Sequence, residues 1–195
     1  MPFMQCRHGI VSMNHGLCGH LEIDGSRVVF DGGKGYTEKD FGKSFPSAYI
    51  WMQCNHFGEE KMSFMCSVAT VPFFTGVMTG YLCLFWYNGV FYNFSSYTKA
   101  RIVVLESDGK RMRIVFEGRE FRFEVVSYQD KLWAIKSPSH GELTSRTFEG
   151  LTSTMDVRLW KRSVMGWDLV VEDYGRHAGI EMCDDRHELV NFFNK

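Results

Sequence analysis

The stretch MRIVFEGREFRFEVV, residues 112–126, decides the fold class because its apolar and polar side chains alternate. Six apolar side chains fall on one face of their strand, namely Met112, Ile114, Phe116, Phe121, Phe123 and Val125. A repeat of two residues is that of an extended strand with one buried face and one wet face. The stretch therefore predicts antiparallel β-sheet.

Turn signals recur at short intervals along the rest of the chain. Asp24-Gly25, Asn88-Gly89 and Asp108-Gly109 each separate two strand-like runs, and such pairs suit the positive φ angles of a tight hairpin. We expect about a dozen strands, near residues 18–23, 27–31, 34–41, 47–57, 61–71, 78–87, 90–97, 101–107, 111–117, 120–127, 131–136, 154–162 and 167–173.

These features predict one all-β domain over residues 1–195. Regularly spaced short strands favour an antiparallel barrel or a strongly curved sheet of roughly ten to twelve strands. The segment DDRHELVNFF, residues 184–193, is the only one that could make a short helix.

Composition bounds the function. The net charge is -1, and basic and acidic residues interleave, so we expect no nucleic-acid partner. Aromatic residues make up 15% of the chain, which indicates a large core or an apolar pocket.

Cysteine usage and targeting motifs bear on the cellular compartment. The six cysteines form no CxxC pair, and neither a signal peptide nor a transmembrane segment is recognisable. We expect free thiols and a cytoplasmic protein.

The candidate chemistry lies in GGKGYTEKDFGKSFPSAYIWMQCNHF, residues 32–57. On a strand, Tyr36, Glu38 and Asp40 point to one side, and Trp51, Gln53 and Asn55 likewise share a face. These groups either form a solvated surface or face inward into an apolar barrel. A carboxyl group that faces inward would hold its proton more tightly and could act as a general acid.

The same stretch resembles the signature segment of the tocopherol cyclase family. The segments PFMQCRHGIVSMNHGLCGHLEID (residues 2–24) and VVEDYGRHAGIEM (residues 170–182) are similar to that family as well. The resemblance implies a lipocalin-like β architecture, related to that of carotenoid hydratases. It also implies protonation of a prenyl double bond in a phytyl benzoquinol and ring closure to a chromanol, with no metal and no redox cofactor.

The resemblance assigns roles by position. Tyr36, Glu38 and Asp40 are candidates for the acid and its hydrogen-bond partner, and His8 for a base or relay. Seven further residues are expected to contact substrate, with Trp51 shielding a cation and Gln53 and Asn55 orienting the phenol; the other four are His56, Phe85, Tyr87 and His177.

Alternatives remain open from the residues alone. A zinc site built from His8, His15, His20 and His56 lacks a recognisable ligand spacing, so we expect no metal. His177 suits either a pocket rim or a surface turn. The chain is expected to be a cofactor-free cyclase or hydratase, a carrier of a hydrophobic small molecule, or a structural or regulatory half-protein that has lost both activities.

The resemblance also bears on partners. It implies a two-part chain whose C-terminal half this sequence matches, so we expect a homodimer or a separately encoded N-terminal half. A prenylated substrate also makes peripheral membrane contact possible.

Overall fold

The computed structural model describes residues 5–73, 76–183 and 189. Within these ranges the chain forms fourteen β-strands, which confirms the all-β prediction. In chain order they are β1 (Cys6–Leu17), β2 (His20–Ile23), β3 (Ser26–Val29), β4 (Gly33–Gly42), β5 (Tyr49–Cys54), β6 (Met62–Phe73), β7 (Gly76–Tyr87), β8 (Val90–Asn93), β9 (Arg101–Ser107), β10 (Arg111–Glu117), β11 (Phe121–Tyr128), β12 (Trp133–Ser139), β13 (Glu142–Ser163) and β14 (Gly166–Cys183).

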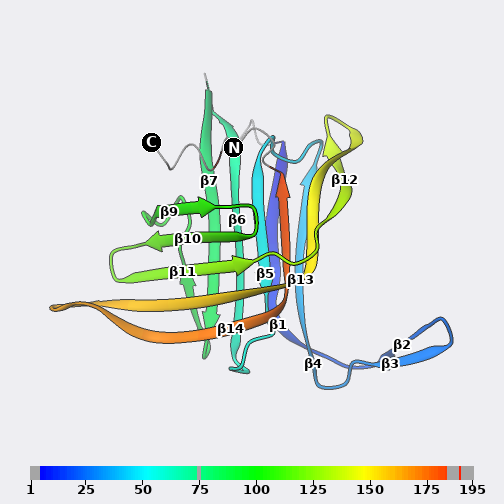
Figure 1. The fold of residues 1–195 in the computed structure, drawn as a ribbon, viewed down its shortest axis with the longest axis horizontal. Coiled ribbons are helices and arrows are strands. Elements are labelled where there is room, and N and C mark those ends of the chain that lie inside the picture. The colour runs from blue at the N-terminus through cyan, green and yellow to red at the C-terminus, as the bar shows by residue number, and fades with distance from the viewer. Residues whose placement is uncertain (1–4, 74–75, 184–188, 190–195) are drawn as a thin grey trace.

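Ten of these strands form one antiparallel sheet that doubles over on itself. Its order is β8-β7-β6-β5-β14-β13-β11-β10-β9, and β12 also pairs with β13. Figure 1 shows β5, β6 and β7 in one layer, with β9, β10 and β11 crossing them in a second. In the described structure the end strands β8 and β9 are not paired with each other. The strongly curved sheet is therefore the correct alternative, and the closed barrel is not.

The long strands β13 and β14 join the two layers. Both bend near the middle of their shared ladder, where the register shifts between Gly150 and Ser153 and again between Ser153 and Met155. Such bulges bend a strand and increase its twist. They also interrupt the two-residue alternation, so the sequence predicted only the parts of these strands next to their connecting hairpin, residues 154–162 and 167–173.

Aromatic side chains fill the space between the two layers. The Phe123 ring on β11 lies 4.7 Å from that of Phe85 on β7 and 5.4 Å from that of Phe64 on β6, measured between centroids. All three are fully buried. The apolar face predicted from the alternation over residues 112–126 is therefore the face that packs on the core.

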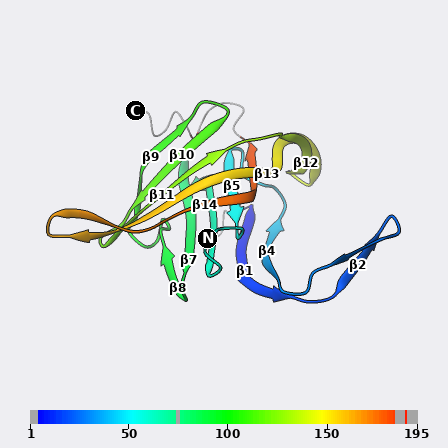
Figure 2. The same cartoon turned by 60° about the horizontal axis from the view of Figure 1, so that its bottom comes forward.

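A second, two-stranded sheet lies outside this core. It pairs β1 with β4 and is called the ribbon below, and the β2–β3 hairpin extends from its end (Figures 1 and 2). The Ser63 hydroxyl on β6 donates a hydrogen bond to the Met13 carbonyl oxygen at 2.7 Å, and the Lys34 ammonium donates to the Glu60 carbonyl oxygen at 2.6 Å. The sequence did not predict β1, whose small and polar residues and two register shifts give it no clean alternation.

The predicted hairpin turns are present. Asp24 and Gly25 have φ angles of 49° and 77°, and Asn88 and Gly89 have φ angles of 48° and 84°. At the third turn only Gly109 has a positive φ. There the Asp108 carboxylate accepts hydrogen bonds from two backbone amides instead.

The predicted C-terminal helix, residues 184–193, lies outside the described residues except for Leu189, which is buried in the core. No helix in the described part of the chain is long and apolar enough to cross a membrane.

Candidate functional site

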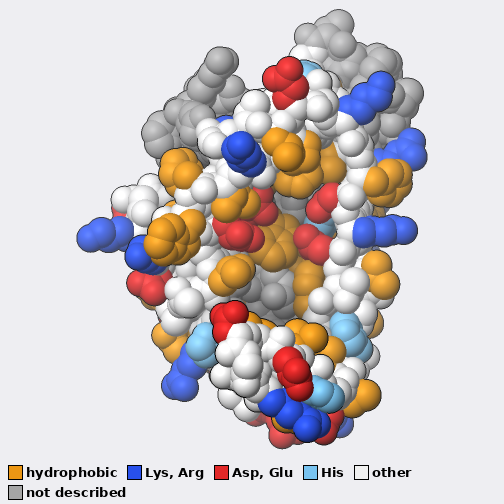
Figure 3. Space-filling model, turned by 90° about the vertical axis from the view of Figure 1, so that its right-hand side faces the viewer, with side chains coloured by type: hydrophobic (Ala, Val, Ile, Leu, Met, Phe, Trp, Pro, Cys, Tyr) orange, Lys and Arg blue, Asp and Glu red, His pale blue; other side chains and the backbone are white. Residues whose placement is uncertain are grey.

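A cavity of about 350 Å³ lies between the ribbon and the main sheet. The floor of the cavity is one face of the main sheet, and strand alternation explains which side chains it carries. Trp51 on β5, Ala69 on β6 and Leu82 on β7 face the cavity, whereas their neighbours on the opposite face belong to the core. Figure 3 shows the opening as a hollow with apolar side chains at its base and carboxylates on its walls.

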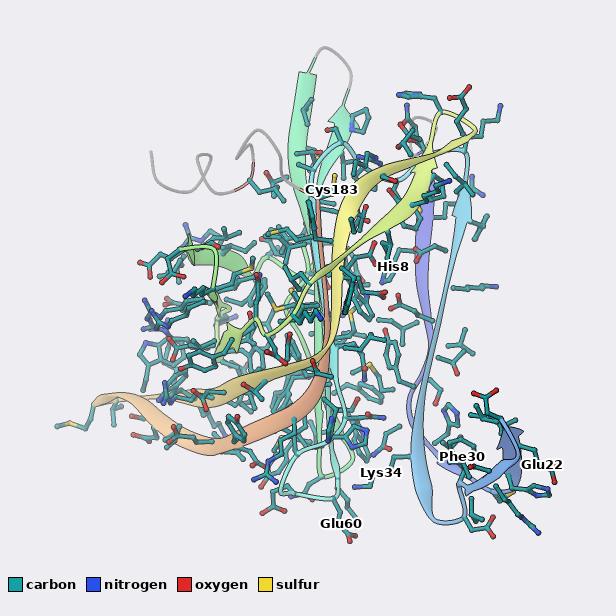
Figure 4. The ribbon with its side chains drawn as sticks, turned by 45° about the vertical axis from the view of Figure 1, so that its right-hand side comes forward. His8, Glu22, Phe30, Lys34, Glu60 and Cys183 are labelled. Carbon is teal, nitrogen blue, oxygen red and sulfur yellow. The ribbon has the colours of Figure 1, made fainter. Side chains whose placement is uncertain are left out.

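The ribbon forms one wall and carries the predicted polar residues. Tyr36, Glu38 and Asp40 alternate along β4, and the register places His8 of β1 directly opposite Asp40. His8, Glu38 and Asp40 line the cavity, and Figure 4 shows His8 on the ribbon, on the side of the main sheet. The inward alternative therefore matches the structure for Glu38 and Asp40, whereas Tyr36 contacts Glu38 without lining the cavity.

Hydrogen bonds join these side chains into one cluster. His8 Nδ1 lies 2.8 Å from Asp40 Oδ1, and His8 Nε2 lies 3.6 Å from Glu38 Oε2. The Tyr36 hydroxyl donates to Glu38 Oε2. Trp51 Nε1 donates to the same oxygen at 3.0 Å, which ties the ribbon to β5. Glu38 therefore accepts hydrogen bonds both from the ribbon and from the floor of the cavity.

The contacts within the cluster change the pKa values of its members. Burial lowers the pKa of His8, but the hydrogen bond that His8 donates to Asp40 and the charges of Glu38 and Asp40 outweigh it, so this pKa is raised. Burial and the hydrogen bond to Glu38 raise the pKa of Tyr36. Burial and Asp40 raise the pKa of Cys6 to about 11. The tyrosine and the thiol therefore keep their protons at neutral pH.

The main sheet contributes a further carboxyl group to the cavity, which sequence reasoning missed. Glu181 on β14 lines the cavity and accepts a hydrogen bond from the Tyr49 hydroxyl. Burial raises the pKa of Glu181, the Tyr49 bond lowers it, and the charges of Glu149, Asp40 and Glu38 raise it further, with a net increase. Glu181 lies in the segment VVEDYGRHAGIEM. Alternation along a strand places Glu181 and Gly179 on the same face, and this pattern is the sequence signal that could have identified it.

The rest of the lining is mainly apolar. Its side chains include Phe45, Pro46, Val71, Met78, Leu82 and Tyr81. Apolar walls with a few converging polar groups are typical of small-molecule sites.

Phe85 and Tyr87 do not belong to this lining, contrary to the expectation for them. Phe85 is fully buried in the core, and Tyr87 packs against that core. The apolar character of their strand on both faces left open which face would meet a ligand. The core takes the face that carries Phe85.

Four more expected substrate contacts also lie away from the cavity lining. Gln53 lies two residues after Trp51 on β5 and is half-buried outside the cavity lining. Asn55 is buried just beyond the end of that strand. His56 and His177 are exposed and contact each other edge to face, with ring centroids 5.6 Å apart. The structure therefore brings Trp51 to the acidic cluster without these four residues.

One group in the described residues has the composition of a cation site. The ligand atoms of His8, Glu38 and Asp40 all lie within 4.8 Å of one another. One imidazole and two carboxylates could hold a divalent ion. The expectation that this chain uses no metal stays a prediction.

Comparisons with known proteins agree with the motifs. The family model "Tocopherol cyclase-like" matches residues 6–183. The chain is similar to "Probable tocopherol cyclase, chloroplastic" of Oryza sativa subsp. japonica and to "Tocopherol cyclase, chloroplastic" of Zea mays. Each is 40% identical over 57 residues, which is 29% of this chain and 12% of the relative. No solved structure matches. With the family model spanning most of its length, the chain belongs to the tocopherol cyclase-like family.

Proposed function

We propose that this chain catalyses the acid-dependent cyclisation, or hydration, of a prenyl double bond in an apolar prenylated quinol, without a cofactor. The observation that carries the proposal is a cavity with carboxyl groups, an imidazole and a tryptophan on walls that are otherwise largely apolar.

Each part of the reaction has a candidate group in the cavity. Protonation of the double bond needs an acid, and ring closure needs an acceptor for the phenol proton. Glu38, Asp40 and His8 can each transfer a proton. His8 lies at hydrogen-bond distance from Asp40 and 3.6 Å from Glu38. The Trp51 ring beside them is suited to stabilise a developing tertiary cation. Tyr36 orients Glu38 through its hydroxyl.

The test is incubation of the protein with a phytyl-substituted hydroquinone in heavy water, followed by mass spectrometry. Cyclisation yields a chromanol with one deuterium bound to carbon, and hydration yields the corresponding tertiary alcohol. Glu38→Gln and Asp40→Asn should each lower the rate by about 10²–10⁴-fold if the residue transfers a proton. Unchanged rates in both variants would remove these two assignments.

A second candidate is a carrier that binds the same class of ligand without chemistry. The apolar part of the lining favours it, since that surface suits a hydrocarbon chain. Recovery of unchanged hydroquinone bound to the protein after the incubation would support the carrier and refute the enzyme.

Self-association is also part of the proposal. The end strand β8 carries the exposed side chains of Val90 and Phe91, and it pairs on one side only in the described structure. Apolar side chains on an open edge promote association, and a two-fold homodimer would cover both copies. Light scattering that gives a monomer at micromolar concentration would refute the homodimer.

A further inference from the structure

The carboxyl groups of the cavity outnumber its cationic partners. Glu38 and Asp40 line the cavity from the ribbon and Glu181 lines it from the main sheet. Glu149 lies outside the lining, and its charge acts on Glu181. In the described residues, no lysine or arginine forms an ion pair with any of the four. His8 supplies at most one positive charge. Like charges that share a partly buried site favour retention of a proton by one of them.

Strand register identifies the carboxyl group that is most crowded. Glu149 on β13 lies directly opposite Glu181 on β14, so their side chains share one face of the sheet. Like charges directly opposite one another destabilise an antiparallel pair. On its other side Glu181 lies opposite Trp51 of β5. Glu181 therefore has a like charge on one side and an aromatic ring on the other.

A chain of hydroxyl groups that ends at Glu181 is compatible with a proton on the Glu181 carboxyl group. The buried Thr147 hydroxyl donates to the Ser137 hydroxyl at 2.8 Å. The Tyr49 hydroxyl lies 3.0 Å from Thr147 Oγ1 and also contacts the Glu181 carboxyl group. Tyr49 has one hydrogen for these two contacts. When Glu181 is protonated, Tyr49 can donate to Thr147 and accept from Glu181, so that every contact has its own hydrogen.

The acidic cluster on the ribbon is arranged differently. Glu38 Oε2 already accepts hydrogen bonds from Tyr36 and Trp51, and Asp40 Oδ1 lies 2.8 Å from His8 Nδ1. These oxygens are arranged as acceptors. The two walls of the cavity therefore present a proton donor and proton acceptors to the same space.

We infer that Glu181 is the catalytic acid and that the His8–Asp40 pair is the base, an assignment that rests on the proposed function. The Glu181 proton forms a new C–H bond with one alkene carbon, and the other carbon becomes a tertiary cation beside Trp51. The phenol oxygen then forms the C–O bond and releases its proton to the His8–Asp40 pair. The His8–Asp40 pair then releases that proton to solvent, and solvent returns one to Glu181, so both groups are restored. The reaction is an isomerisation, so it needs no oxidant or reductant.

The first test does not depend on turnover. Carbon-13 NMR of the glutamate side-chain carboxyl groups, assigned with Glu181→Gln, should show Glu181 titrating above the other glutamates. A Glu181 resonance that titrates at the usual glutamate pKa of about 4.3 would overturn the inference, whatever the wild-type activity.

The second test uses the phytyl-substituted hydroquinone in heavy water. Glu181→Gln should lower deuterium incorporation into product by about 10²–10⁴-fold while retaining hydroquinone binding. Glu22→Gln, on the remote β2–β3 hairpin (Figure 4), is the matched control. A Glu181→Gln protein with the wild-type rate would overturn this inference and leave the proposed function standing. A wild-type protein that binds hydroquinone but yields no product would overturn both the proposed function and this role for Glu181.

Discussion

Replacing Asp40 by Asn removes the carboxylate that pairs with His8, and the cost can be worked from the geometry. The two side chains approach to 2.8 Å, and their exposed fractions are 19% for His8 and 28% for Asp40. A hydrogen bond to a charged group contributes about 1.5–3 kcal/mol to stability. Partial exposure screens this pair, so we expect the free energy of unfolding to fall by about 1–2 kcal/mol near pH 5.

The pH dependence has a definite sign. The pKa of His8 is raised in the folded protein, because the hydrogen bond that His8 donates to Asp40 and the charges of Glu38 and Asp40 outweigh the lowering by burial. The protonated imidazole therefore stabilises the folded state fully below the unfolded histidine pKa of about 6.5. That contribution is lost as the pH rises through the folded pKa. The difference between wild type and Asp40→Asn should therefore shrink between about pH 5 and pH 9.

Urea unfolding at both pH values measures the difference, and a proton NMR titration of the His8 ring, assigned with His8→Gln, measures the pKa directly. Asp156→Asn is the control, because Asp156 accepts a hydrogen bond from the Tyr128 hydroxyl and pairs with no histidine in the described structure. A His8 pKa that is the same in wild type and Asp40→Asn would refute the reasoning. So would a stability difference that stays constant with pH.

Phe123→Ala should lower the free energy of unfolding by about 3–5 kcal/mol in urea titrations, because its ring is fully buried against three other phenylalanines. A loss below about 1 kcal/mol would contradict this packing. Glu124→Gln should cost about 2–3 kcal/mol by the same assay, since Glu124 Oε1 accepts a hydrogen bond from Arg113 at 2.6 Å; the loss should diminish in acid, because the two arginines that contact Glu124 outweigh its burial and lower its pKa. Ala69→Phe should fill the cavity and abolish hydroquinone binding in a fluorescence titration, whereas Val77→Phe, at an exposed position, should leave binding unchanged; equal binding by both variants would place the ligand elsewhere.

Local patterns predicted the local features of this fold. The Asp-Gly and Asn-Gly pairs mark real turns because the φ angles they favour belong to those residues themselves. The shared side of Tyr36, Glu38 and Asp40 follows from alternation along a single strand. Features that need two distant strands to meet could not be predicted in this way.

The candidate site depends on such meetings. His8 reaches Asp40 only through the β1–β4 register, and Glu181 reaches Trp51 only through the β14–β5 register. The family resemblance suggested His8 by position but said nothing of Glu181. Alternation likewise grouped Gln53 with Trp51, although the cavity extends along only part of that strand.

The division of the site between the ribbon and the main sheet links activity to local stability. Three side-chain hydrogen bonds in the described structure tie the ribbon to the rest of the protein, and they involve Trp51, Ser63 and Lys34. Undocking the ribbon would break these bonds while leaving the aromatic core intact, so its opening free energy lies well below that of global unfolding. Amide hydrogens of β1 and β4 should therefore exchange with solvent faster than those of β6 and β11. A ligand that touches both walls would slow this exchange, because it binds only the docked form.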